Sequence, residues 1–276
     1  MRAYVELVRA PAALTVLGDT VAGAAFAGGL PGRAALLPLA SVAFYWSGMA
    51  LNDWSDRALD ADERPERPIP SGRVEPGTAL AVAAGLTAAG FGLAAVAGRL
   101  RAAVPLAAAV WAYDLLLKNT PAGPLGMAAC RGLDVLMGGG RPALPAALAI
   151  GGHTLGVTAL SRGEVHGTST AVARGVLGGT AAAALAAATG RARSWRHRLL
   201  GTAGAAAYAG FVGRAQLAAV QAPDAVTVRT ATKAGIHGMV PLQSALAARA
   251  GSARAALLVA CALPLARRLG RKVGPT

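Results

Sequence analysis

The chain has 276 residues, of which 54% are hydrophobic and 14% are charged. Its long apolar runs argue against an ordinary soluble domain and favour a polytopic membrane protein, because about 20 apolar residues span a bilayer as a helix. The net charge of +14 comes with only 4% aromatic residues. That combination argues against nucleic-acid binding and for contact with anionic lipid headgroups or a phosphorylated ligand.

The first predicted span covers about residues 11–29 and contains one acidic residue, Asp19. Arg2 and Arg9 precede an apolar run, as in a signal peptide, but Asp19 and the spans that follow favour a retained transmembrane helix. An acid inside a span faces a cavity or pairs with another helix, so Asp19 is a candidate cavity residue. The second span covers about residues 35–53 and leads directly into a polar stretch.

This polar stretch, residues 52–73, is the most carboxylate-dense part of the chain. Asp53, Asp56 and Asp60 follow the spacing i, i+3, i+7, which puts three carboxylates on one face of a helix. Carboxylates there repel one another, and Mg²⁺, which prefers oxygen ligands, would stabilise them. Three arginines that suit bidentate phosphate binding follow: Arg64, Arg67 and Arg73. The pattern predicts a metal–diphosphate site, with a solvated polar loop as the alternative.

The order of these residues is also familiar. Asn52 to Asp60 reads NDxxDxxxD and Arg67 to Gly72 reads RPxxSG, which resembles the first signature of the UbiA superfamily of membrane prenyltransferases. The resemblance implies an all-α transmembrane bundle of about nine helices around a central cavity, as one domain over residues 1–276. It further implies Mg²⁺ held by Asp53, Asp56 and Asp60, and a diphosphate contacted by Asn52 and Arg67.

Spans three and four are predicted at about residues 77–98 and 101–118. Span four ends in Tyr113 and Lys118, which could simply anchor the helix at the membrane interface. The pair also resembles the Y…K element that follows the fourth helix in UbiA proteins and faces the diphosphate there. The resemblance therefore makes Lys118 a diphosphate contact and Tyr113 a cavity candidate.

Span five, about residues 122–140, contains Arg131 and Asp134, which lie three residues apart and so share a helix face. A buried ion pair that locks two helices and a catalytic role are both open for them. Span six covers about residues 143–161.

Residues 158–167 stand where the superfamily carries a second aspartate motif, typically DxxxD. This chain offers Arg162, Glu164 and His166 there and no aspartate. The sequence SRxEVxG resembles the EboC-like branch of the superfamily. The missing aspartates imply that this site holds fewer than two metal ions. The guanidinium of Arg162 would then neutralise part of the phosphate charge, and Glu164 would be the catalytic carboxylate.

The remaining spans are predicted at about residues 170–190, 199–220 and 252–268, with 226–249 as a doubtful one, giving nine or ten helices. The first motif follows helix two, Lys118 follows helix four and the second motif follows helix six, so all three lie on one face of the membrane. The basic residues near the first motif place this face in the cytosol of a cell-membrane protein, although the basic turn at 191–198 disagrees.

The expected chemistry is transfer of an isoprenyl group from a prenyl diphosphate to a small acceptor. Mg²⁺ and the basic groups would stabilise the departing diphosphate, and the prenyl chain would lie in an apolar channel in contact with membrane lipid. Four groups are candidates for stabilising the allylic cation or deprotonating the acceptor: Asp19, Arg131, Asp134 and Glu164.

Nothing in the sequence selects among aromatic, quinone-precursor, tetrapyrrole and glycerol-lipid acceptors, or gives an oligomeric state. Three other functions remain open: a prenyl-diphosphate cyclase, a lipid or polyol transferase that uses the altered second motif, and a non-catalytic membrane protein or transporter with a degenerate site. The charge clusters lie at helix ends and not at the bilayer midplane, which favours an enzyme over a transporter.

Overall fold

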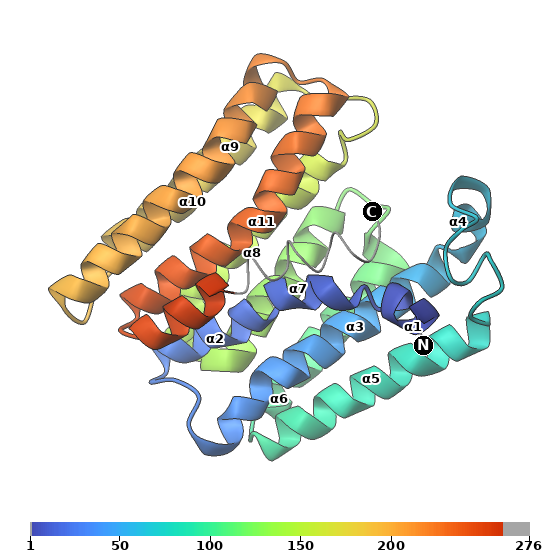
Figure 1. Ribbon diagram of the computed structural model, residues 1–276, viewed down its shortest axis with the longest axis horizontal. Coiled ribbons are helices and arrows are strands. Elements are labelled where there is room, and N and C mark those ends of the chain that lie inside the picture. Colours follow the sequence, from blue (N-terminus) through green and yellow to red (C-terminus); the bar gives the residue numbers. More distant parts are fainter. Residues whose placement is uncertain (1, 262–276) are drawn as a thin grey trace.

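The computed structural model describes residues 2–261, which fold into a bundle of α-helices with no β-strand among them (Figure 1). The long helices are α2 (Leu17–Phe26), α3 (Leu37–Ser55), α5 (Pro76–Val96), α6 (Leu100–Ala112), α7 (Gly123–Gly139), α8 (Leu144–Ser161), α9 (Thr170–Thr189), α10 (Trp195–Gln221) and α11 (Ala225–Arg249). Two short helices, α1 (Arg2–Leu7) and α4 (Arg57–Glu63), lie near the motif. The all-α prediction is confirmed.

Several helices match the predicted membrane spans. Within residues 2–261, five stretches are long and apolar enough to cross a membrane: Gly32–Ser55, Pro76–Val96, Leu100–Leu117, Arg141–Ser161 and Thr170–Thr189. The doubtful segment 226–249 is also a helix, α11. This helix packs against α8, α9 and α10. The predicted span at 252–268 lies partly outside the described residues. The protein is a multi-pass membrane protein.

The first predicted span, residues 11–29, is not one continuous helix. The chain forms a short 3₁₀ helix at Ala10–Thr15 and then α2. A ten-residue helix is about 15 Å long, about half of the hydrocarbon core. Gly28 and Gly29 end this segment with φ angles of 94° and 107°, which side chains other than glycine rarely adopt. Segment α2 packs inside the bundle against α7.

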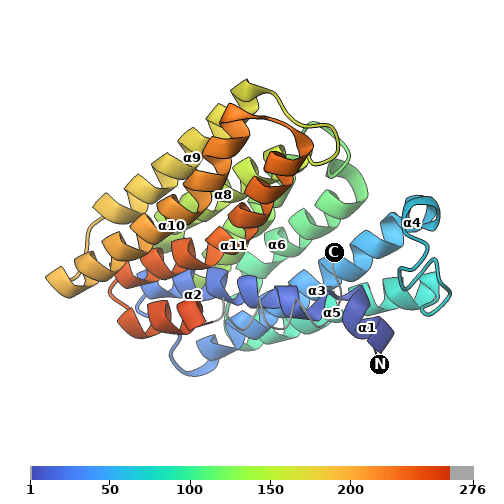
Figure 2. The same cartoon turned by 45° about the horizontal axis from the view of Figure 1, so that its top comes forward.

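The bundle has two parts, which Figures 1 and 2 show in blue to green and in yellow to red. In the first part α3 packs against α5, and α6 packs against α7. In the second part α10 packs between α9 and α11. Helices α2 and α7 join the parts, because α7 contacts α8 and α2 contacts α11.

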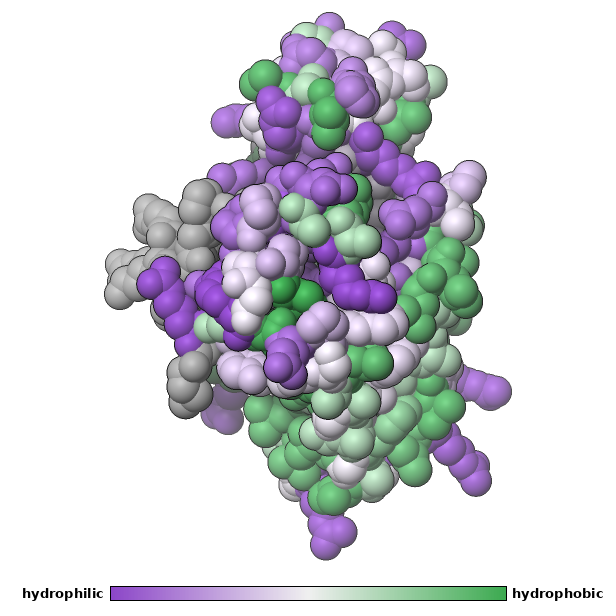
Figure 3. Space-filling model, turned by 90° about the vertical axis from the view of Figure 1, so that its right-hand side faces the viewer, coloured by the Kyte–Doolittle hydropathy of each residue, from purple (hydrophilic) through white to green (hydrophobic). Residues whose placement is uncertain are grey.

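The acidic motif lies at the end of the bundle where α4 and the loop to residue 75 extend beyond α3 (Figure 1). Viewed from this side, polar residues gather over the middle of the face, and apolar residues cover the flank below and to the right (Figure 3). The loop is anchored, because Ile69 and Val74 are buried against Leu7, Leu51 and Ala79. A freely solvated loop would not bury these side chains.

Candidate active site

The three motif carboxylates lie at the junction between α3 and α4. Asp53 is in the last turn of α3, Asp56 lies between the helices, and Asp60 is in α4. The single helical face predicted for residues 53–60 is therefore interrupted at Asp56. As a result Asp53 and Asp60 converge on one partner, and Asp56 contacts another.

Arg67 joins Asp53 and Asp60. Its Nη1 lies 3.1 Å from Asp53 Oδ1 and 2.8 Å from Asp60 Oδ2. Only 3% of Asp53 and 4% of Asp60 is exposed, and buried carboxylates need such partners to stay charged. The chain turn that follows α4 thus brings the RPxxSG segment back onto the acidic motif.

Arg9 is a second cation on Asp53, with Nη2 at 3.0 Å from Oδ1. Its backbone is left-handed, with φ of 47°, the only such non-glycine residue among those described. This conformation costs about 1–2 kcal/mol for a residue with a Cβ, and strain of this kind clusters at functional sites. The sequence reasoning used Arg9 only as a charge near the membrane and did not predict its place in the site.

Lys118 holds the third carboxylate. Its Nζ lies 2.6 Å from Asp56 Oδ1 and donates to Ser55 Oγ at 2.6 Å. Lys118 follows a single π-helical turn, Tyr113–Leu117, and such turns are frequent at functional sites. The structure therefore brings the predicted Y…K element to the end of α3.

The segment predicted as a second motif contributes unevenly. Arg162 donates to the carbonyl oxygens of Thr120 and Lys118, so its side chain supports the loop that carries Lys118. Among the described residues, the side chain of Glu164 makes no hydrogen bond or ion pair with the first motif, and its carbonyl oxygen accepts from Arg229. His166 is exposed. The role predicted for Glu164 stays a prediction.

The oxygen donors of the motif have the chemistry that Mg²⁺ requires. Within residues 2–261, no three His, Cys, Asp or Glu side chains converge closely enough to hold a metal ion together. Asp53 and Asp60 nevertheless share a single guanidinium nitrogen, so their oxygens already surround one positive charge. A divalent cation fits this pair if it takes the place of Arg67, which would then be free for phosphate.

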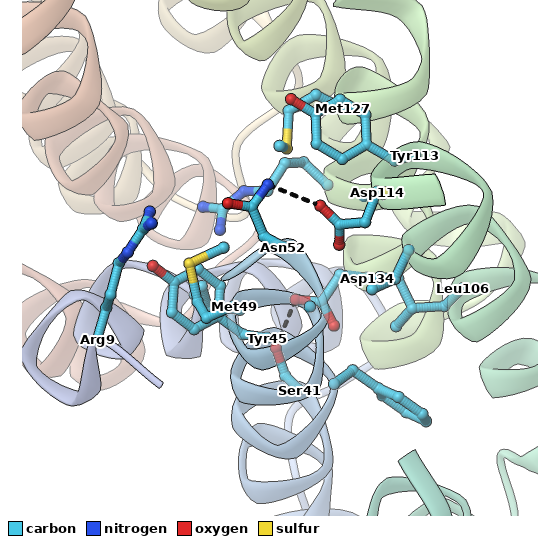
Figure 4. Close-up of a pocket in the computed structure, with 16 residues that line it drawn as sticks. Arg9, Ser41, Tyr45, Met49, Asn52, Leu106, Tyr113, Asp114, Met127 and Asp134 are labelled. Carbon is cyan, nitrogen blue, oxygen red and sulfur yellow. Dashed lines mark hydrogen bonds between the residues drawn. The ribbon is translucent and has the colours of Figure 1, made fainter. Parts of the chain in front are cut away.

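Beside the motif lies a cavity of about 250 Å³ between α3, α6 and α7. Its polar mouth, next to the motif, is formed by Arg9, Asn52, Tyr113 and Asp114 (Figure 4). Apolar side chains line the middle, including Phe44, Met49, Leu106, Val110 and Met127. The α3 residues that face it run from Asn52 to Ser41, a length of about 16 Å at 1.5 Å per residue.

Asp114 is a functional candidate that the sequence reasoning missed. It is 4% exposed, and its Oδ1 accepts a hydrogen bond from Asn52 Nδ2 at 3.2 Å. Asn52, predicted to contact the diphosphate, is thus directed toward Asp114 in this structure (Figure 4). The signal was available in the sequence, because Asp114 is an acid inside the predicted fourth span.

The far end of the cavity, here named the floor, comprises Ser41, Arg131 and Asp134, with Asp19 and Gln243 behind them. Arg131 Nε lies 2.9 Å from Asp19 Oδ2, and Gln243 Nε2 donates to Asp19 Oδ1 at 2.6 Å. Asp134 Oδ2 accepts from Ser41. Arg131 and Asp19 thus form a buried ion pair that joins α7 to α2, which is one of the two alternatives predicted for each of them. No ion pair between Arg131 and Asp134 is found among the described residues.

A further contact ties the RPxxSG loop to the start of the chain. Arg73 Nη1 lies 2.5 Å from Glu6 Oε2 in α1, and Arg2 Nε lies 3.2 Å from Glu6 Oε1. The hydrogen bond from Arg73 is the largest cause of a lowered pKa for the Glu6 carboxyl. The loop is therefore fixed on one side by α1 and on the other by the acidic motif.

Solved structures of known proteins share this fold. A structure described as digeranylgeranylglyceryl phosphate synthase matches with a TM-score of 0.67 at 18% identity, over 90% of this chain and 97% of that one. A UbiA homologue from Aeropyrum pernix K1 matches with a TM-score of 0.65 at 17% identity, over 84% and 96%. A UbiA homologue from Archaeoglobus fulgidus, bound to DMAPP and Mg²⁺, matches with a TM-score of 0.54 at 12% identity, over 87% and 99%.

Sequence relatives match this chain over less than half of its length. Digeranylgeranylglyceryl phosphate synthase from Methanopyrus kandleri is 42% identical over 128 residues, 44% of this chain and 46% of the relative. Protoheme IX farnesyltransferase from Anaeromyxobacter sp. is 41% identical over 102 residues, 34% of each chain. The chain thus spans less than half the length of these curated relatives.

The UbiA prenyltransferase family itself matches residues 15–160, which include the acidic motif, Lys118 and the whole cavity wall from α3, α6 and α7. This is more than half of the chain. Nothing in these matches assigns it to the EboC-like branch, which stays a prediction. The chain belongs to the UbiA prenyltransferase family.

Proposed function

We propose that this protein is an integral-membrane prenyltransferase that moves an isoprenyl group from a prenyl diphosphate to a small acceptor, with Mg²⁺, and that residues 1–276 form one domain for this purpose. The observation that carries the proposal is that three carboxylates and the three cations paired with them lie beside the mouth of an apolar cavity. The carboxylates are Asp53, Asp56 and Asp60, and the cations are Arg9, Arg67 and Lys118.

In this proposal the donor lies with its diphosphate on the motif and its apolar chain in the cavity. Asp53, Asp56 and Asp60 would hold Mg²⁺, which supplies Lewis-acid stabilisation of the leaving diphosphate. With the carboxylates on the metal, Arg67 and Lys118 would be free to contact phosphate oxygens. Arg162 supports this arrangement through the loop at Lys118 and Thr120.

The cations of the site lie where negative charge would develop during the reaction. As the allylic C–O bond breaks, negative charge accumulates on the departing diphosphate, next to Arg9, Arg67 and Lys118. The apolar walls, with Phe44, Leu106 and Met127, keep water away from the allylic cation until the acceptor attacks. Tyr113 at the mouth contacts the same space from the π-helical turn that follows α6.

For the acceptor we propose a lipid that bears a hydroxyl on a glyceryl phosphate. The names of several relatives, which are digeranylgeranylglyceryl phosphate synthases, support this choice over an aromatic ring. Because one relative is a protoheme IX farnesyltransferase, a tetrapyrrole is the second candidate for the acceptor. We place the protein in the cell membrane with the motif face in the cytosol, on the basis of the basic residues near the motif.

A transfer assay tests this function. Detergent-purified protein is incubated with Mg²⁺, radiolabelled geranylgeranyl diphosphate and geranylgeranylglyceryl phosphate. The proposal predicts that label moves into a doubly prenylated lipid and that EDTA stops the transfer. Transfer to 4-hydroxybenzoate in its place would support the aromatic acceptor, and no transfer to any acceptor together with no donor binding would reject the proposal.

A further inference from the structure

This inference rests on the proposed function and concerns the proton that a hydroxyl acceptor must lose. Asp114 lines the cavity at its mouth, opposite Asn52 (Figure 4). Its hydrogen-bond partner Asn52 directly precedes the motif carboxylate Asp53 in the chain. A base is needed at this position, where the acceptor would meet the reacting carbon of the donor.

The two carboxylate oxygens of Asp114 have different surroundings. Oδ1 accepts from Asn52 Nδ2, which fixes the orientation of the carboxylate. The other oxygen faces the cavity, as Figure 4 shows, and is left open partly by a glycine on α3. A Cβ at Gly48 would lie 3.5 Å from Asp114 Oδ2, so any larger side chain there would occupy the space beside this oxygen.

The other carboxylates of the described site are less suitable as a base. Those of the motif pair with Arg9, Arg67 and Lys118, and would bind the metal when the donor is present. Asp19 is shielded behind Arg131 and Gln243. Asp134 faces the cavity but belongs to the floor, beside Ser41, and Ser41 is about 16 Å from Asn52 along α3.

We propose that Asp114 is the general base of the transfer and that Asn52 positions it. The acceptor hydroxyl hydrogen-bonds to Asp114 Oδ2. As its oxygen forms a bond to C1 of the prenyl donor, the C1–O bond to the diphosphate breaks and the electron pair leaves with the diphosphate. The hydroxyl proton passes to Asp114, which becomes neutral and later returns the proton to water. This fits an acceptor with an ionisable O–H, such as a glycerol hydroxyl.

The test separates donor binding from proton transfer in the full-length, detergent-purified protein. Asp114→Asn keeps the shape of the side chain and can still accept from Asn52, but it cannot take a proton. We expect kcat with geranylgeranylglyceryl phosphate to fall by about 10²–10⁴-fold, the usual contribution of a general base. Binding of radiolabelled geranylgeranyl diphosphate with Mg²⁺ is expected to stay within about threefold. Asp62→Asn, an exposed carboxylate of α4, is the matched control.

A second variant leaves the carboxylate in place. Gly48→Ala narrows the space beside Asp114 Oδ2 and also approaches Val110 Cγ1 at 3.0 Å. We expect KM for the acceptor to rise by about tenfold or more, because small displacements of reacting groups are costly, while donor binding is kept. This variant also serves if Asp114→Asn does not fold.

Each outcome has one meaning. A wild type that binds no prenyl diphosphate overturns the proposed function itself. A wild type that binds and transfers, with kcat of Asp114→Asn within about threefold of it, overturns only the assignment of Asp114. Loss of donor binding in Asp114→Asn would also overturn it, since the carboxylate would then act in donor binding. If Asp114→Asn transfers the prenyl group faster to an aromatic carbon than to the hydroxyl, the result supports Asp114 as the base for the hydroxyl acceptor.

Discussion

The mouth and the floor of the cavity both contain buried carboxylates, but their partners differ in origin. At the mouth, the cations Arg9, Arg67 and Lys118 come from loops and helix ends, and 31% of the Arg9 side chain is exposed. At the floor, Asp19 of α2 and Gln243 of α11 are fully buried, and Arg131 comes from the middle of α7. The mouth can exchange partners for a ligand, whereas the floor holds the helices together.

The packing around the two regions reinforces this difference. Behind the floor, α2 and α7 touch backbone to backbone, since a Cβ at Gly23 would lie 2.0 Å from the carbonyl oxygen of Val135. At the mouth, the chain instead bends at Asp56 and passes through the loop that carries Arg67. Similar sets of charged residues therefore serve binding at one end and stability at the other.

The largest effect is expected at the floor. Asp19→Ala leaves Arg131 buried without its carboxylate, and removing one partner of a buried pair costs about 3–5 kcal/mol. We expect a large drop in the temperature at which detergent-purified protein unfolds, measured by differential scanning fluorimetry. Lysates should also contain less folded protein. An unchanged unfolding temperature would mean that the floor does not hold α2 to α7.

The close contact between α2 and α7 gives the second prediction. Gly23→Ala would force the helices apart and lower stability by about 1–3 kcal/mol, as overpacking does. The matched control is Gly175→Ala in α9, where a Cβ would meet no atom within 4 Å. There the change should be neutral or stabilising by about 0.5–1 kcal/mol, because alanine favours a helix. Equal unfolding temperatures for the two variants would refute the close packing.

At the mouth the expected effect appears in ligand binding. Lys118→Ala removes the cation on Asp56 and should weaken binding of geranylgeranyl diphosphate about tenfold, measured by filter binding with Mg²⁺. That factor equals about 1.4 kcal/mol. The unfolding temperature without ligand should fall less than for Asp19→Ala, because the Asp56 side chain is 23% exposed whereas that of Asp19 is fully buried. A large loss of stability with unchanged binding would contradict the conclusion that the charged residues at the mouth serve ligand binding.

The smallest effect concerns the contact between α1 and the RPxxSG loop. Because the pKa of Glu6 is lowered by Arg73, this contact stabilises the protein above the ordinary pKa and is lost as the pH falls through the lowered pKa. Glu6→Gln should therefore unfold slightly more easily than wild type at neutral pH. The difference should vanish in acid below the lowered pKa of Glu6, as seen in unfolding temperatures across a pH series. A difference that persists in acid would exclude this ion pair as the cause.

Much of the fold follows from the sequence, since apolar runs with Gly and Pro boundaries locate α3, α5, α8 and α9 directly. The first span was predicted wrongly because hydropathy does not register the left-handed turn at Arg9 or the break before α2. Spacing identified Asp53, Asp56 and Asp60, but it assumed one unbroken helix. Only the folded chain separates Asp56 from the other two.

The partners of these groups could not be predicted from local patterns. Arg9 and Asp53 are 44 residues apart in the chain, and Gln243 and Asp19 are 224 apart. Arg131 and Asp134 share a helix, yet Arg131 pairs with Asp19 of α2 and Asp134 accepts from Ser41 of α3, because α7 contacts both of these helices. Asp114 was detectable as an acid inside a span. Its contact with Asn52 depends on how α3 packs near the π-helical turn.

The measurement that tests the account most directly is equilibrium binding of radiolabelled geranylgeranyl diphosphate to purified protein, with Mg²⁺ and with EDTA, for wild type and Asp56→Ala. The account predicts tight binding only to wild type and only with Mg²⁺, because Asp56 would hold the metal that the diphosphate needs. Binding that is unchanged by EDTA or by Asp56→Ala would contradict it, since the acidic motif would then serve structure and not the diphosphate.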